Sequence, residues 1–132
     1  MTRRGLLLLI ALPLGADERQ EVVDWLGQWV QRLTEDNASE FLGAFEKDLR
    51  ERLSRDVWAM VRNYEVVSSI QVLSVDGAAV ELDWYLALKG RAANAATAER
   101  RERVKLTVLK VKKGWVVEKL EPESFFAPFQ NG

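Results

Sequence analysis

The sequence predicts an α+β fold in which three N-terminal helices pack on an antiparallel sheet of about four long strands. Apolar residues recur every three or four positions before residue 65 and every second position after it. Glycine-containing turn signals separate the alternating segments, which can then be paired with their neighbours along the chain. With 132 residues, one domain is long enough to bury a core without disulfides or metals.

Composition narrows the chemistry that the chain can perform. There is no cysteine and no histidine, which excludes thiol nucleophiles, disulfides and the commonest general base. We therefore expect no metal site and no cofactor. Basic residues gather between residues 89 and 119, but strand alternation divides them between two faces and the net charge is -1. We expect no nucleic-acid partner.

Residues 1–16 have the three-part form of a secretory signal. Arg3 and Arg4 precede an apolar stretch over residues 6–14, and acidic residues begin at Asp17. The stretch is too short to span a bilayer core of roughly 30 Å, so we expect no stable membrane anchor. The sequence thus predicts an exported protein, periplasmic or secreted, with a domain over residues 17–129. The alternative is that the apolar stretch is a buried strand or helix.

Three helices are expected before residue 65. The first covers residues 17–34, with acidic residues at its start, where the helix dipole favours them. Asn37 or Ser39 can cap the second, and Ser54 is a plausible cap for a short third helix. The apolar positions with helical spacing are Val22, Leu26, Trp29, Val30, Leu33, Phe41, Leu42, Phe45, Leu49, Leu53, Val57, Trp58, Met60 and Val61.

The strands can be paired residue by residue. A first strand over residues 66–73 ends before Asp76 and Gly77, a strong hairpin signal. Two pairings are considered for this hairpin: Val75 with Ala78 across a two-residue turn, or Val66, Ile70 and Val72 with Leu86, Leu82 and Val80 across a three-residue loop. The second is preferred because it gathers apolar residues on one face. The later pairings are Leu82 with Leu106, Trp84 with Val104, Asp83 with Lys105, Tyr85 with Arg103, Lys89 with Glu99, Val111 with Trp115, Leu109 with Val117, Leu106 with Leu120 and Lys105 with Glu121.

These pairings leave an apolar patch on the polar side of the sheet unless a bulge intervenes. Such a patch needs a cover, either the aromatic tail over residues 122–129 or a second copy of the sheet. The second option predicts a homodimer through this outer face. Its candidate interface residues are Tyr85, Leu109, Val111, Trp115, Val117, Phe125 and Phe126.

The order of elements resembles the nuclear transport factor 2-like superfamily, which includes ketosteroid isomerase-like and polyketide cyclase-like proteins. The resemblance covers about residues 17–129 and includes the segments at residues 80–84 and 114–118. The tail from Pro122 to Pro128 is similar to that of exported bacterial members of unknown function. The resemblance implies a strongly bent, cone-shaped sheet of cystatin-like topology, a pocket at the open end, and frequent dimerisation across the sheet.

Isomerase-type members use a strand carboxylate with a tyrosine or protonated acid in an apolar cavity. The candidates for such roles are Tyr64, Asp83 and Glu102, although the predicted register places Asp83 on the outer face in an ion pair. Glu102 either lies at a pocket mouth with Arg100 or is exposed to solvent. The candidate ligand-binding residues are Trp29, Trp58, Tyr64, Trp84, Arg100 and Glu102.

The sequence thus favours a non-catalytic, exported domain that binds a small apolar ligand or a protein partner as a homodimer. The alternative is a small enzyme of the isomerase, dehydratase or cyclase kind. A third possibility is a structural subunit whose cavity is filled by its own tryptophans.

Overall fold

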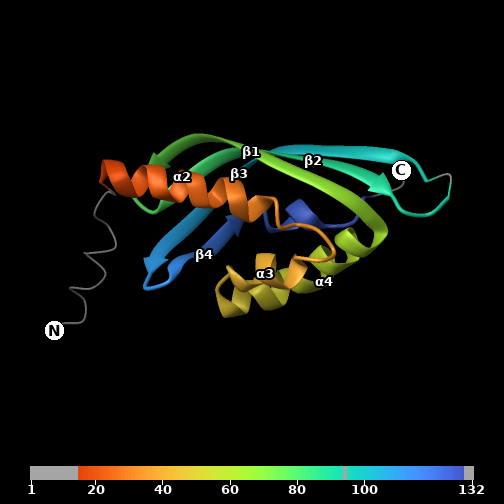
Figure 1. Cartoon of the computed structure of the whole chain (residues 1–132), viewed down its shortest axis with the longest axis horizontal. Helices are drawn as coiled ribbons and strands as arrows, with labels where there is room; N and C mark the ends of the chain where they lie inside the picture. Colours follow the sequence, from red (N-terminus) through yellow and green to blue (C-terminus); the bar gives the residue numbers. More distant parts are fainter. Residues whose placement is uncertain (1–14, 94, 130–132) are drawn as a thin grey trace.

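The computed structural model describes residues 15–93 and 95–129. The elements are α2 (Ala16–Val30), α3 (Ala38–Gly43), α4 (Lys47–Asn63), β1 (Tyr64–Asp76), β2 (Ala79–Gly90), β3 (Thr97–Val111), β4 (Gly114–Glu121) and a 3-10 helix, η1 (Glu123–Phe126). The strands form one antiparallel sheet in the order β1-β2-β3-β4, and the helices pack against it (Figure 1). The α+β class with three helices and four strands is confirmed.

The proposed signal peptide, residues 1–16, lies outside the described residues except for Gly15 and Ala16. Ala16 is the first residue of α2. Among the described residues, no helix is both long enough and apolar enough to cross a membrane.

The break between the second and third helices is not where the sequence predicts it. Ser54 lies inside α4, which runs without interruption from Lys47 to Asn63. The break comes earlier, because Phe45 forms a bridge with Val117 of β4 and leaves the helical path. Glu46 then caps α4, its carboxylate accepting a hydrogen bond from the Leu49 backbone N–H at 3.1 Å. A tertiary contact with the last strand therefore decides this boundary.

The first two strand pairs are displaced by two residues from the predicted registers. Val66 lies opposite Leu88, and Trp84 lies opposite Glu102. The hairpin turn does use Gly77 with a positive φ of 61°, but the bulge lies between Val72 and Ser74 rather than at the turn. Because the displacement is an even number of residues, each side chain of β2 still points to the predicted face.

A bulge in β4 changes which residues face the core. The predicted pairing holds from Lys105 with Glu121 to Thr107 with Lys119, and then the register shifts by one. Trp115 and Val117 are consequently buried, at 5% and 0% exposure, so their expected placement on the outer face was wrong. The bulge removes both side chains from water, although Trp115 Nε1 is then buried without a hydrogen-bond partner among the described residues.

The aromatic tail closes the core rather than covering the outer face. Phe125 and Phe126 are 0% and 1% exposed, and their ring centroids lie 4.9 Å and 5.5 Å from that of Trp84. Phe126 also contacts Phe41 of α3 edge-on, at 5.8 Å. The end of the chain thus completes a core that begins in α2 and α3.

Candidate functional site

Aromatic side chains fill the space between the helices and the sheet. Trp29 stacks on Phe41 at 4.6 Å and lies 5.7 Å from Trp84. Both indole N–H groups are satisfied: Trp29 Nε1 donates to the Phe41 carbonyl at 2.9 Å, and Trp84 Nε1 donates to Ser68 Oγ at 2.8 Å. Trp29 and Trp84, two candidate ligand-binding residues, are therefore buried core residues, 2% and 0% exposed.

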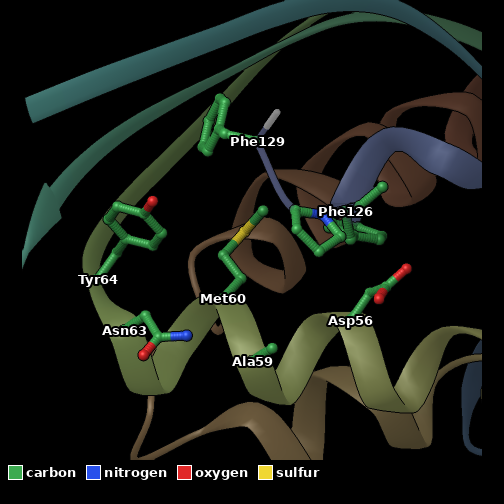
Figure 2. Close-up of a pocket in the computed structure, with 9 residues that line it drawn as sticks. Asp56, Ala59, Met60, Asn63, Tyr64, Phe126 and Phe129 are labelled. Carbon is green, nitrogen blue, oxygen red and sulfur yellow. The ribbon is translucent and has the colours of Figure 1, made fainter. Parts of the chain in front are cut away.

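A pocket remains where α4, the start of β1 and the tail meet, a region that we call the mouth. Its volume is about 180 Å³ (Figure 2). Asp56, Met60 and Asn63 line it from one face of α4, because residues four and seven positions apart lie on the same side of a helix. The other lining residues are Ala59, Tyr64, Phe126, Ala127, Pro128 and Phe129.

A second hollow of about 430 Å³ lies beside the first. Asn63, Tyr64 and Phe129 line both, so these three residues form the partition between them. The rings of Tyr64 and Phe129 meet edge to face, with centroids 6.0 Å apart. The remaining residues that line the second hollow come from the β2–β3 connection and its flanks: Gly90, Arg91, Ala92, Ala95, Ala96, Thr97 and Ala98.

Arg100 holds the tail at the mouth. Its guanidinium lies over the ring of Phe129, with the central carbon 4.2 Å from the ring centroid, and Nη1 donates to the Phe125 carbonyl. Burial lowers the pKa of Arg100, while the nearby Glu102 acts in the opposite direction. Within residues 15–93 and 95–129, no carboxylate lies within ion-pair distance of this guanidinium.

The structure does not bring the three catalytic candidates together. Tyr64 lines the mouth, but Glu102 is exposed on β3 and Asp83 lies on the outer face of the sheet. Arg101 Nη2 lies 2.7 Å from Asp83 Oδ2, and this hydrogen bond lowers the pKa of Asp83. Asp83 thus forms the surface ion pair expected from the sequence, with Arg101 in place of Lys105.

The other candidates lie in different surroundings. Trp58 is half-buried and carries the Arg62 guanidinium over its ring at 4.9 Å. Tyr85 and Leu109 are half-buried on the outer face, where Glu99 raises the pKa of Tyr85. Val111 is 43% exposed. No group of three or more acidic side chains within the described part of the chain could hold a metal ion.

Four residues that shape the mouth are not predicted from the sequence: Asp56, Met60, Asn63 and Phe129. The signal for the first three was present in their spacing along one helix face. The predicted helix start at Ser54 obscured this signal, because it places Asp56 in the first turn of a short helix. No pattern in the sequence predicts that Phe129 lines the mouth, because its position depends on the path of the tail.

No family model and no curated protein matches this chain. Among solved structures, it is similar to the 1.8 Å structure of Aln2 from a Streptomyces species. The TM-score is 0.56 and the sequence identity is 13%, over 83% of this chain and 91% of that chain. At this identity the similarity shows a shared fold alone. The chain is thus an α+β domain with the fold of Aln2.

Proposed function

We propose that the chain is an exported, non-catalytic domain of the nuclear transport factor 2-like superfamily that binds a small, largely apolar ligand at the mouth. The observation that carries this proposal is the contrast between a filled interior and two adjoining hollows at the mouth. The larger hollow falls within the range of about 300–1,000 Å³ typical of small-molecule sites, which favours a ligand over a protein partner.

Two features support a binding role over catalysis: Asp83 lies outside the core, and the mouth offers apolar surface. An isomerase-type site needs a carboxylate directed into an apolar cavity, where burial can tune its pKa. The buried polar residue among those that the structure describes is Ser68, which is not a carboxylate. The catalytic candidate Asp83 is instead paired with Arg101 on the outer face. Ligand binding at the mouth needs shape and apolar surface, which Met60, Phe126 and Phe129 supply.

We further propose that the domain forms a homodimer through the outer face of its sheet. The side chains of Val67 and Val111 lie on this face of the sheet and are 67% and 43% exposed. Replacing either with lysine should shift the protein to monomer in sedimentation velocity, whereas Gln31→Lys at the C-cap of α2 should not. Equal sedimentation of all three variants and the parent would argue against this interface.

Native mass spectrometry of the protein purified from cells tests the main proposal, because one spectrum reports the subunit count and any retained molecule. We expect a dimer carrying extra mass. A bare monomer would contradict both the dimer and the ligand. Fractionation tests export: a shortened chain outside the cytoplasm supports it, and an uncleaved cytosolic chain refutes it.

One observation favours the alternative of a small isomerase, dehydratase or cyclase-type enzyme. Tyr64 and Asp56, a phenol and a carboxylate, line the same pocket. If the alternative holds, the retained molecule should be converted on incubation with the protein, as followed by NMR, and Tyr64→Phe and Asp56→Asn should stop the conversion. A retained molecule that stays unchanged would exclude it.

A further inference from the structure

Phe129 is one of the three residues that separate the two hollows. Its ring contacts both Tyr64 and Arg100, and it lines both hollows of the mouth. Figure 2 shows Phe129 on the strand side of the pocket, farther than Tyr64 from the surface of α4. The side chain thus occupies the middle of a larger potential site.

The surroundings of this ring suit an aromatic group. An edge-to-face contact with the Tyr64 ring and the flat guanidinium of Arg100 are two preferred surroundings of an aromatic ring. Phe129 is only half-buried, whereas Phe125 and Phe126 are fully packed. Phe129 can therefore leave without disturbing the two rings that complete the core.

The charge of the larger hollow suits an anion. Arg100 is partly buried, and its contacts are a ring face and a backbone carbonyl. No acidic residue lines the larger hollow within the described part of the chain, while Arg91 does. Arg91 is already engaged, because it donates to the Val61 carbonyl at 3.1 Å and lies 3.7 Å from Glu35. Arg100 is thus the guanidinium with donors available for a carboxylate.

We propose that Phe129 occupies a binding site for an aromatic carboxylate, and that the ligand displaces it. The ligand ring takes the place of the Phe129 ring against Tyr64, and its carboxylate pairs with Arg100. This inference rests on the proposed ligand-binding function and specifies the chemical class of the ligand. The tail then acts as an internal competitor, which lowers the apparent affinity by the fraction of time for which the site is closed.

Calorimetric titration of the full chain with 2-naphthoate, and with uncharged 2-naphthamide, tests the proposal. We expect Phe129→Ala to bind 2-naphthoate about tenfold more tightly than the parent, because the competing ring is gone. In the Phe129→Ala background, Arg100→Gln should remove the preference for the carboxylate over the amide, a loss of about tenfold, while Arg100→Lys should keep most of it. Arg101→Gln on the outer face is the matched control and should change nothing.

Amide chemical shifts locate the binding. In the parent, 2-naphthoate should shift the signals of Asn63, Thr97 and Phe129 and leave those of Leu120 unchanged. Weaker binding to Phe129→Ala than to the parent would show that the ring is a wall of the site and would overturn the proposal. Equal affinity for naphthoate and naphthamide, or no binding to any variant, would overturn it too. None of these three results tests the proposed ligand-binding function, which is tested by the mass retained in native mass spectrometry.

Discussion

Ser68 and Trp84 illustrate the polar requirements of this core at the scale of single residues. The indole of Trp84 is fully buried, and an unpaired N–H there would keep the full cost of leaving water. The Ser68 hydroxyl, 2.8 Å away, accepts its hydrogen bond. A serine on the otherwise apolar, core-facing side of β1 therefore has a structural role.

Replacing Ser68 with alanine should lower the free energy of unfolding by about 1–3 kcal/mol, because Trp84 Nε1 loses its acceptor in the core. Urea denaturation monitored by tryptophan fluorescence measures the change. Ser69→Ala is the matched control: Ser69 is exposed on the opposite face of the same strand, so its loss should be nearly neutral. Equal effects of the two substitutions would show that the hydrogen bond contributes nothing.

Asp83 shows how its surroundings determine what a carboxylate can do. Its hydrogen bond with Arg101 keeps its pKa below the ordinary value, so at neutral pH it stays ionised and weakly basic. A general base matched to neutral pH needs the opposite shift. The same residue type that suggests catalysis in the sequence thus serves in a surface ion pair.

At the scale of elements, the N-cap Glu46 stabilises the start of α4. The backbone N–H groups of Asp48 and Leu49 donate to the Glu46 carboxylate and lower its pKa from the ordinary 4.5. A lowered pKa in the folded state means that Glu46 stabilises the fold above its unfolded pKa. That contribution disappears as the pH falls through the folded value.

Glu46→Gln should therefore lower the Tm at pH 7, and the difference from the parent should shrink as the pH is lowered below about 4. Differential scanning calorimetry at several pH values measures this. Glu51→Gln, an exposed position in the same helix, is the control and should leave the Tm unchanged at pH 7. A pH-independent difference for Glu46→Gln would argue against a role of the ionised cap.

The bulge at Glu118 places the side chains of Trp115 and Val117 of β4 on the core side of the sheet. Removing this one residue should restore a continuous register and keep Trp115 and Val117 in the core, because Val117 already pairs with Val108 and Lys119 with Thr107. We expect a loss in unfolding free energy well below the roughly 3–5 kcal/mol of deleting a large core side chain. Glu118→Ala, which keeps the residue count, should also have little effect; a deletion in urea titrations that costs as much as a core truncation would show that the bulge itself is required.

At the scale of the whole molecule, the tail is part of the core. Phe125→Ala should lower the unfolding free energy by about 3–5 kcal/mol, because the ring is fully buried against Trp84. Ser124→Ala, exposed in the same 3-10 helix, should be nearly neutral. Urea titrations of both variants provide the measurement, and a neutral Phe125→Ala would mean that the core is complete without the tail.

The fold was predictable from the sequence to the extent that it depends on local periodicity. Alternation assigned the faces of β2 correctly even though its pairings were displaced, because a shift of two residues keeps every side chain on its side. Features that depend on distant contacts were not predictable. The helix break at Phe45 requires Val117, and the face of Trp115 requires the bulge at Glu118. The mouth requires the tail to bring Phe129 beside Tyr64, which no local pattern indicates.

The shared core of the first helices and the tail has a consequence for the chain during its synthesis. Phe126 packs on Phe41, so this core cannot close until Phe126 has left the ribosome. At about 5–20 residues per second, the growing chain spends on the order of ten seconds without its final packing. A translocase that accepts only unfolded chains could engage the protein throughout that interval.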